Sequence, residues 1–412
     1  MADESMDARP GSDLPGVAVA LTRLLDDAHL AVPDDMAKVV ARAAAALDAQ
    51  VAIYLVEYDQ RNLVRLSQPA RNEIDKVSVE GTVPGRVFRE LRPQVVDRDG
   101  RRRVWLPLID GTERLGVLAL TVPDDRDVEA PQWRDAFRWF ATLTAHLLAV
   151  KSPFGDALEM TRRENPRTLP AELLWQLLPP LTFGTDGFVV TCVLEPAAQV
   201  AGDAFDYAVS NEKADLAIFD GTGHDLTSGL VTSVAIAASR NGRRNGASLQ
   251  ERVRLTDETI GKQFGHERFV TGVHAALDRS SGLLRYVNSG HPVPLLIRRG
   301  KVVKRLSDGR RPLLGLNRTD VPVAEEQLEP GDWLVLYTDG VTEARDPAGS
   351  EFGERRLVDF LERAVAADQP PPETLRRLVH AILAHQNDVL QDDATVLVAQ
   401  WRTGTEDVFF AD

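Results

Sequence analysis

Apolar side chains follow helical and strand-like spacings in turn along the first 150 residues. Two helical patterns open the chain, one from Val17 and one from Pro33. Strand-like runs follow and are expected to form strands at 51–56, 63–66, 104–108 and 115–122. A helix that begins with a proline is expected between them at 84–91, and a long helix at 133–150 ends the region. Asp110-Gly111 is a turn signal between the last two strands. The pattern predicts an antiparallel sheet with helices over residues 15–150.

The second half of the chain mixes the same two spacings after a stretch that fits neither. Prolines and a glycine break the helical pattern over residues 151–170, which we interpret as a linker. Residues 171–402 combine both kinds of run in one domain, and Ser248 with Glu251 forms a capping box at one helix start. The clearest strands are 283–287, 293–297 and 395–401, and the clearest later helices are 355–365 and 372–390. The ends of the chain, 1–14 and 403–412, are expected to be a flexible leader and a loose tail.

Length and composition agree with two globular domains. A chain of 412 residues exceeds what one hydrophobic core usually fills, and its formal net charge of −14 disfavours binding to nucleic acid or to an anionic membrane. The single cysteine, Cys192, excludes an intramolecular disulfide and a cysteine-based zinc site. The longest apolar stretch, 136–150, is too short to span a bilayer, and the first residues do not form a secretory signal. These features predict a cytoplasmic protein.

Four aspartates recur in one local setting, beside glycine or a second carboxylate at the end of an apolar run. They are Asp203, Asp220, Asp339 and Asp392. Asp-Gly is a common turn dipeptide, so any one of these positions alone is more often a structural turn. Four of them in one domain are harder to obtain as independent turns. If they converge, their carboxylates form an all-oxygen site that suits magnesium or manganese better than zinc or copper.

Such a site is suited to phosphate chemistry. Two divalent ions about 4 Å apart can lower the pKa of a bridging water and neutralise phosphate oxygens during in-line attack. No side-chain nucleophile is then needed, and we assign none. Water activated between two such ions, Mn²⁺ or Mg²⁺, could therefore attack a phosphate group at this site.

The segments around these aspartates occur in a recognisable order. They read Ala201-Gly202-Asp203-Ala204-Phe205-Asp206, Asp220-Gly221-Thr222-Gly223-His224-Asp225, Tyr337-Thr338-Asp339-Gly340-Val341-Thr342-Glu343-Ala344 and Asp392-Asp393-Ala394-Thr395. This order resembles the SpoIIE-type branch of the PP2C serine/threonine phosphatases, and the resemblance spans nearly all of residues 170–402. It implies an α-β-β-α sandwich for the C-terminal domain.

The resemblance also implies which atoms bind the metal ions. The ligands would be the carboxylates of Asp203, Asp220, Asp339 and Asp392, together with the main-chain carbonyl of Gly221. Of the two adjacent carboxylates near the end, Asp392 is preferred, because the next position is asparagine in many relatives. Asp393 is the reserve choice.

Two positions depart from the family pattern, and two histidines lie close to it. Ala201 replaces a glycine, and Asp225 replaces another glycine and is expected to cap the helix that follows. His224 lies two positions beyond the general acid of the eukaryotic relatives, where Thr222 stands, so a structural or substrate-edge role is favoured over acid catalysis. His291, between a glycine and a proline, is expected to be a turn or packing residue.

The first domain carries a weaker pattern of its own. Paired leading helices, the segment Gly81-Thr82-Val83-Pro84-Gly85 before a short helix, and the late strand Leu115-Gly116-Val117-Leu118-Ala119-Leu120 together resemble a GAF domain over about residues 15–150. GAF domains bind small molecules or dimerise, but we find no ligand signature and assign no cofactor to this domain. The arginines at 98 and 101–103 are interpreted as a solvated loop.

The two resemblances together imply an α+β protein-serine/threonine phosphatase under the control of a GAF-like domain. The implied substrate is a phosphorylated anti-sigma-factor antagonist of a bacterial partner-switching pathway. The alternative is a phosphatase-like binding module without turnover, against which the presence of all four aspartates argues. Helix 133–150 and the amphipathic segment 171–179 could also form the seam of a homodimer.

Overall fold

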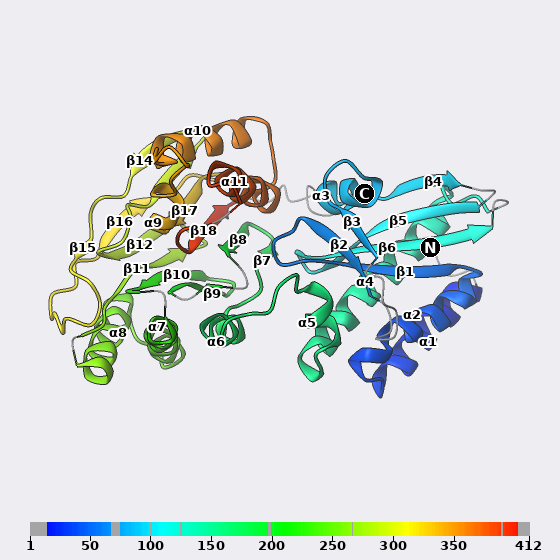
Figure 1. Cartoon of the computed structure of the whole chain (residues 1–412), viewed down its shortest axis with the longest axis horizontal. Coiled ribbons are helices and arrows are strands. Elements are labelled where there is room, and N and C mark those ends of the chain that lie inside the picture. Colours follow the sequence, from blue (N-terminus) through cyan, green and yellow to red (C-terminus); the bar gives the residue numbers. More distant parts are fainter. Residues whose placement is uncertain are drawn as a thin grey trace, which may run out of the picture. The chain divides into compact units, whose positions relative to one another are not determined.

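The computed structural model describes most of the chain as two compact units. The described residues are 15–66, 75–98, 101–123, 126–196, 199–200, 202–223, 225–265, 267–388 and 390–402. The units divide between Glu164 and Asn165 (Figure 1). The segments expected to be a leader and a tail lie outside the described residues, as do Ala201 and His224.

A six-stranded antiparallel sheet forms the centre of the N-terminal unit. Its strands are β1 Gln50–Val56, β2 Asn62–Arg65, β3 Lys76–Ser78, β4 Gln94–Arg98, β5 Arg101–Asp110 and β6 Glu113–Pro123. They pair in the order β3-β2-β1-β6-β5-β4. The helices of this unit are α1 Pro15–His29, α2 Met36–Ala44, α3 Val83–Glu90, α4 Pro131–Lys151 and α5 Ala157–Arg162. The predicted antiparallel sheet with helices is confirmed.

Alternation along the central strands decides which helices cover which face of this sheet. Leu118 and Leu120 of β6 pack with the apolar side chains of α1, α2 and α4. Val117 and Ala119, on the other face, pack with the apolar side chains of α3. The helices therefore lie on both faces of the sheet (Figure 1).

The arginine cluster of this unit corrects one sequence-based expectation. Arg101, Arg102 and Arg103 are the first residues of strand β5, so the interpretation of a solvated loop was wrong for them. Strand pairing accommodates their charges, because Arg102 Nε lies 3.3 Å from a carboxylate oxygen of Asp97 on β4, and the Arg103 guanidinium lies over the Trp105 ring.

Two sheets face each other in the C-terminal unit. Their strands are β7 Thr182–Thr185, β8 Phe188–Glu195, β9 Asp203–Val209, β10 Lys213–Gly221, β11 Val270–Asp278, β12 Leu283–Ser289, β13 Leu295–Arg298, β14 Lys301–Arg305, β15 Arg310–Arg311, β16 Ala324–Gln327, β17 Trp333–Tyr337 and β18 Ala394–Trp401. One sheet has the order β15-β12-β11-β10-β9 with β16 beside β12, and the other has the order β14-β13-β17-β18-β8-β7. The first is mixed through the parallel pair β12–β15, and the second is antiparallel throughout.

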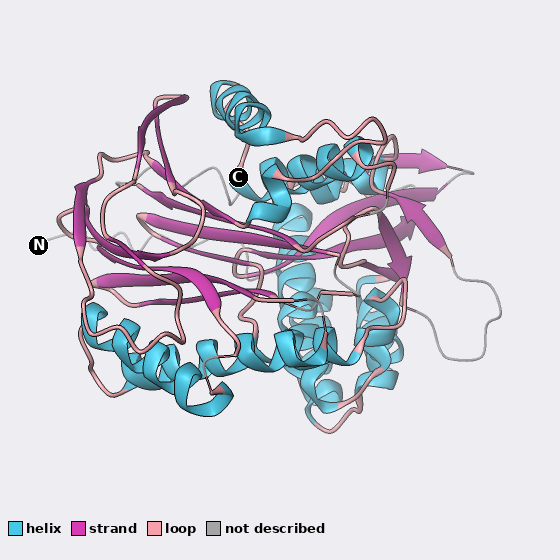
Figure 2. Ribbon diagram, turned by 60° about the vertical axis from the view of Figure 1, so that its left-hand side comes forward, coloured by secondary structure: helices cyan, strands magenta, loops and turns pink. Residues whose placement is uncertain are grey.

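Helices cover the outer faces of both sheets. They are α6 Leu169–Leu177, α7 Leu226–Arg244, α8 Leu249–Phe264, α9 Asp339–Thr342, α10 Gly353–Ala366 and α11 Pro371–His385. In Figure 1, α7 and α8 lie below strands β9 to β12, and α10 and α11 lie above β17 and β18. Figure 2 shows the same unit from a turned view, with its strands between helices on both sides. The architecture is the expected α-β-β-α sandwich.

The side chains of the inner strands divide this unit into separate apolar layers. Leu334, Leu336 and Leu397 point between the two sheets and pack with Phe188 and Cys192. The alternate residues of the same strands pack with the apolar faces of α10 and α11 instead. This layering holds β17 and β18 rigidly at the centre of their sheet.

Two local expectations about helix ends can be compared with the structure. Ser248 and Glu251 form the predicted capping box at the start of α8. The helix expected to run to residue 390 ends at His385, because Asn387 and Asp388 adopt the left-handed backbone conformation that a helix does not continue through. None of the described helices has the length and hydropathy that a membrane crossing requires.

Candidate metal centre

Two of the predicted metal ligands come from neighbouring strands of one sheet. Asp203 is the first residue of β9, and Asp220 is the last but one of β10. The two are directly opposite each other in the antiparallel register. Opposite residues of such a pair point to the same face of the sheet, so these two carboxylates are neighbours.

The other two come from the central strands of the second sheet. One residue separates Asp339, which begins the short helix α9, from the end of β17, and one residue separates Asp392 from the start of β18. Because β17 and β18 are antiparallel partners, the end of one lies beside the start of the other. Each sheet therefore contributes two of the predicted carboxylates, which lie at one end of its strands.

Hydrogen bonds between the sheets bring the two pairs together. The Thr338 hydroxyl donates to Asp203 Oδ2 at 2.7 Å, and the same hydroxyl accepts the Thr395 amide at 2.9 Å. Thr338 is completely buried. The Gly202 amide also donates to Asp393 Oδ2 at 2.8 Å. These contacts join the start of β9 to the ends of β17 and β18.

The adjacent aspartates near the end of the chain have different surroundings. Asp393 is half-buried, and its Oδ2 accepts the amides of Gly202 and Asp203, at 2.8 and 3.3 Å. Asp392 is exposed and accepts only the amide of its own neighbour among these contacts, at 2.9 Å. Asp392 is close enough to Asp220 and Asp339 to raise the pKa of both. A carboxylate turned toward main-chain amides has a structural use, whereas the exposed one is available to a cation.

The pKa shifts report a concentration of negative charge. Burial, followed by the neighbouring Asp220 and Asp393, raises the pKa of Asp203 well above its ordinary value. Burial and the carboxylates at 339, 392 and 393 raise the pKa of Asp220 to about 7. Burial and Asp392 raise the pKa of Asp339. Like charges that raise one another's pKa in this way are the environment that a divalent cation neutralises.

Gly221, the predicted main-chain ligand, is the last residue of β10, directly before the loop that leads to α7. An alanine Cβ at position 202 would lie 2.6 Å from the Gly221 carbonyl oxygen, so glycine is required there by close approach. The Gly221 carbonyl also accepts the Ser228 hydroxyl at 2.9 Å. Asp225 caps α7 as predicted, because its Oδ1 accepts the Ser228 amide at 2.9 Å. The Arg268 guanidinium lies against this loop, 3.4 Å from the Thr222 carbonyl oxygen.

The donor set fits a hard cation. Every predicted ligand atom is an oxygen, and the carboxylates carry an excess of negative charge that burial leaves poorly solvated. Sequence reasoning found the aspartates but gave no role to Thr338, which hydrogen-bonds to Asp203, or to Thr271, which lowers the pKa of Asp220. The signal for Thr338 was its place directly before Asp339. Thr271 could be found only from the strand register.

A second group of carboxylates lies in the N-terminal unit. This group consists of Glu57, Asp59 and Glu164, whose carboxylate oxygens all lie within 4.8 Å of one another. Among the residues that the structure describes, no other set of three acidic, histidine or cysteine side chains is as close, so the aspartates of the C-terminal unit are spaced more widely. The Lys76 ammonium already lies 2.6 Å from Glu57 Oε1. Burial raises the pKa of Asp59 to about 6. A built-in lysine cation makes this group a structural charge cluster.

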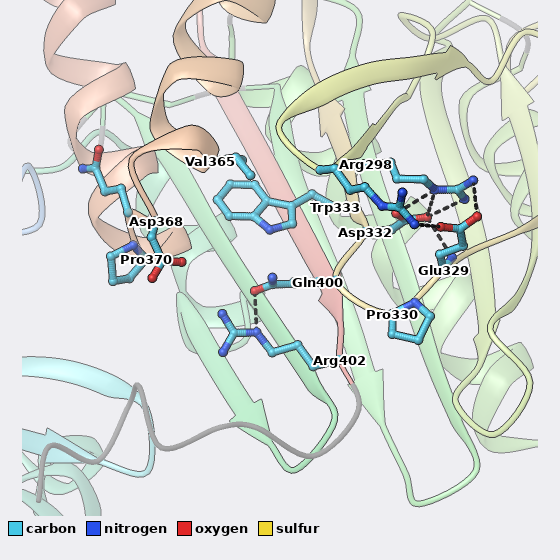
Figure 3. A pocket seen from close by; sticks show the side chains of 13 residues that line it. Arg298, Glu329, Pro330, Asp332, Trp333, Val365, Asp368, Pro370, Gln400 and Arg402 are labelled. Carbon is cyan, nitrogen blue, oxygen red and sulfur yellow. Dashed lines mark hydrogen bonds and ion pairs between the residues drawn. The ribbon is translucent and has the colours of Figure 1, made fainter.

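A pocket of about 320 Å³ lies at the opposite end of β17 and β18 (Figure 3). Trp333, which begins β17, lines it, so it is roughly 20 Å along the strand from Asp339. Its charged groups are largely satisfied by one another: Arg298 lies 2.7 Å from Asp332 and 2.9 Å from Glu329. The pocket is therefore separate from the carboxylates and offers no matching chemistry.

Comparison with protein families matches the part of the chain that holds Asp220, Asp339 and Asp392, and Asp203 lies just before it. Residues 210–402 match the family model described as Stage II sporulation protein E (SpoIIE). The chain is 26% identical to Protein IcfG of Synechocystis sp. over 242 residues, which are 52% of this chain and 38% of that protein. It is 24% identical to phosphoserine phosphatase RsbU of Bacillus subtilis over 205 residues, which are 49% of this chain and 60% of that protein.

One solved structure is also similar to part of this chain. The SiaA-PP2C domain of Pseudomonas aeruginosa is 24% identical, with a TM-score of 0.47, over 52% of this chain and 85% of that one. This chain covers less than two thirds of the length of the two curated relatives.

Proposed function

The C-terminal domain of this chain belongs to the SpoIIE family of PP2C-type phosphatases, and from that premise we propose that it hydrolyses phosphoserine or phosphothreonine esters of a protein. The observation that carries the proposal is the convergence of carboxylates from two sheets at one edge, where they raise one another's pKa. Isolated Asp-Gly turns would not produce this mutual effect.

The proposed metal ligands are those that the family resemblance implies. They are Asp203, Asp220, Asp339, Asp392 and the Gly221 carbonyl, and two Mn²⁺ or Mg²⁺ ions are proposed between them. The exposure of Asp392, and the use of Asp393 Oδ2 by two main-chain amides, support the choice of Asp392. Bound divalent cations would supply Lewis-acid stabilisation of the phosphate oxygens and activation of water.

The chain's own groups orient the carboxylates for this task. The Thr338 hydroxyl fixes Asp203, and the Thr395 amide fixes Thr338 in turn. Such hydrogen-bonded supports determine which carboxylate oxygen faces the cation. No side chain is assigned as a nucleophile, and a structural or substrate-edge role for His224 stays a prediction.

The substrate and its control are proposed from the relatives. The phosphoserine phosphatase RsbU is among them, and we propose a phosphorylated anti-sigma-factor antagonist as the substrate here. The N-terminal unit, with helices on both faces of an antiparallel sheet, supports a GAF-like regulatory domain at residues 15–150, with 151–170 as the linker. A homodimer through this unit and the linker helices is part of the same proposal, and light scattering on the full chain tests it.

The experiment that tests the activity is phosphate release from a serine-phosphorylated anti-sigma-factor antagonist by the full chain. Release is expected to require Mn²⁺ or Mg²⁺ and to be lost in Asp339→Asn, which keeps the size of the side chain and removes its charge. Phosphotyrosine peptide is the control substrate and is expected to release little phosphate.

Two outcomes would contradict the proposal. Release that continues in Asp339→Asn would place the chemistry elsewhere. A wild-type protein that binds Mn²⁺ but releases no phosphate would favour the alternative of a phosphatase-like binding module.

A further inference from the structure

His291 occupies a fixed position between the two sheets of the C-terminal unit. It lies in the connection between β12 and β13 and is 1% exposed. Its amide donates to Asn288 Oδ1 at 2.8 Å, and the Asn288 side-chain amide donates back to the His291 carbonyl at 3.0 Å. Gly290 adopts a φ of +71°, where a Cβ would also lie 2.4 Å from Leu313. This main chain therefore holds the imidazole in one place.

The imidazole contacts a threonine that faces a proposed metal ligand. His291 Nδ1 lies 2.7 Å from the Thr271 hydroxyl oxygen. Thr271 is directly opposite Asp220 in the antiparallel register of β10 and β11. Opposite side chains of such a pair are neighbours, and the Thr271 hydroxyl acts on the Asp220 carboxylate by lowering its pKa.

The direction of these hydrogen bonds follows from the groups involved. A carboxylate that is ionised by binding the proposed cation only accepts, and a threonine hydroxyl has one proton, so in that state Thr271 would donate to Asp220. The His291 Nδ1 must then carry a proton and donate it to the Thr271 oxygen. Burial lowers the pKa of His291 to about 3, so its ring is neutral, and Nε2 has no partner of hydrogen-bond geometry among the described residues.

The ring also reaches the second sheet. It lies near the main chain of Tyr337, the last residue of β17 and two positions before Asp339. The same side chain thus stands between the strand that faces Asp220 and the strand that leads to Asp339. A turn residue chosen only for its backbone would not need this contact.

We propose that His291 is a positioning residue for metal binding, which holds the Thr271 hydroxyl in the orientation that fixes the Asp220 carboxylate. The proposal rests on the proposed metal-dependent function and adds a residue to it. Supports of this kind change metal affinity by about 10- to 100-fold when they are removed.

The test is calorimetric titration of Mn²⁺ into the full chain, with thermal unfolding of each metal-free variant measured beside it. His291→Phe and Thr271→Val are each expected to weaken Mn²⁺ binding about 10-fold or more. Thr271→Ser, which keeps the hydroxyl, is expected to bind Mn²⁺ more tightly than Thr271→Val. The double variant should bind Mn²⁺ no more weakly than the weaker-binding single variant, because both substitutions remove the same connection from His291 through Thr271 to Asp220.

His274 provides the matched control. It is also 1% exposed, it lies on β11 like Thr271, and neither of its ring nitrogens has a hydrogen-bond partner among the described residues. His274→Phe is expected to leave Mn²⁺ affinity unchanged.

Three results separate the inference from the function beneath it. Wild-type Mn²⁺ affinity in His291→Phe and Thr271→Val would overturn the inference alone. If His291→Phe does not fold, equal affinities of the two Thr271 variants overturn it. A wild-type protein that binds no Mn²⁺ would overturn the proposed metal-dependent function itself.

Discussion

Gly340 is the position where one added methyl group should disturb the candidate metal centre most specifically. It is the second residue of α9, directly after Asp339, and its φ is not in the left-handed region. Alanine would therefore suit its backbone and would ordinarily stabilise a helix by about 1 kcal/mol. The obstacle is the space around it.

The structure gives the size of the disturbance. A Cβ at position 340 would lie 1.9 Å from the Asp393 carbonyl oxygen, whereas real Cβ contacts below 3.0 Å are essentially absent. The difference requires a main-chain movement of about 1 Å between α9 and the segment before β18, and overpacking of this kind costs about 1–3 kcal/mol. Asp339 and Asp392 flank the two atoms that must separate, so both proposed ligands move.

The assay for Gly340→Ala is the Mn²⁺ dependence of phosphate release by the full chain, with urea unfolding measured in parallel. A misplacement of about 1 Å can cost on the order of 100-fold in activity, and a shift of the Mn²⁺ midpoint to higher concentration is expected with it. Gly242→Ala is the control, because a Cβ on this buried helical glycine would lie no closer than 3.1 Å to any neighbour, the Arg252 Cγ, and needs only a small adjustment. Wild-type Mn²⁺ dependence in Gly340→Ala would refute the placement of the ligands around this contact.

Three further predictions concern buried polar groups. Thr338→Val removes the 2.7 Å hydrogen bond to Asp203 and is expected to lower the free energy of unfolding in Mg²⁺ by about 1.5–3 kcal/mol, while an unchanged urea midpoint would contradict it. Asp206→Asn breaks the ion pairs of a buried carboxylate with two arginines, at 2.6 and 2.7 Å, and should lower the free energy of unfolding by about 3–5 kcal/mol. Glu325→Gln, which removes an exposed ion pair, should lower it by less than about 1 kcal/mol. Burial and nearby guanidinium groups lower the pKa of His274 from 6.5 to about 3, so its contribution to stability is complete above pH 6.5 and is lost as the pH falls toward 3. Wild-type protein should therefore lose about 1.1 kcal/mol more per pH unit than His274→Phe between pH 6.5 and 5, and parallel stability curves would exclude this role.

Much of the C-terminal fold could be predicted because its central strands carry clear apolar runs. The edge strands could not, since β14 and β16 are short and largely exposed and lack apolar alternation. The helix α5 lies in the segment interpreted as a linker, where a run of six residues is too short to give a periodic signal. The short helix α9 could not be predicted either, because it has only four residues and begins with Asp-Gly, which is a turn signal.

The candidate site, like the fold, could be predicted only in part from the sequence. The aspartates could be predicted because each stands in a recognisable local motif. The groups that orient them depend on strand register and on contacts between sheets, which local sequence does not show. Thr338 and Asp203 are 135 positions apart in the sequence, and Thr271 and His291 are 20 apart.

The measurement that tests the central claim most directly is anomalous scattering from crystals of the full chain soaked in Mn²⁺. The account predicts two manganese peaks enclosed by Asp203, Asp220, Asp339 and Asp392, with the Gly221 carbonyl directed at one of them. Manganese bound elsewhere, with no peak among these four carboxylates, would contradict it.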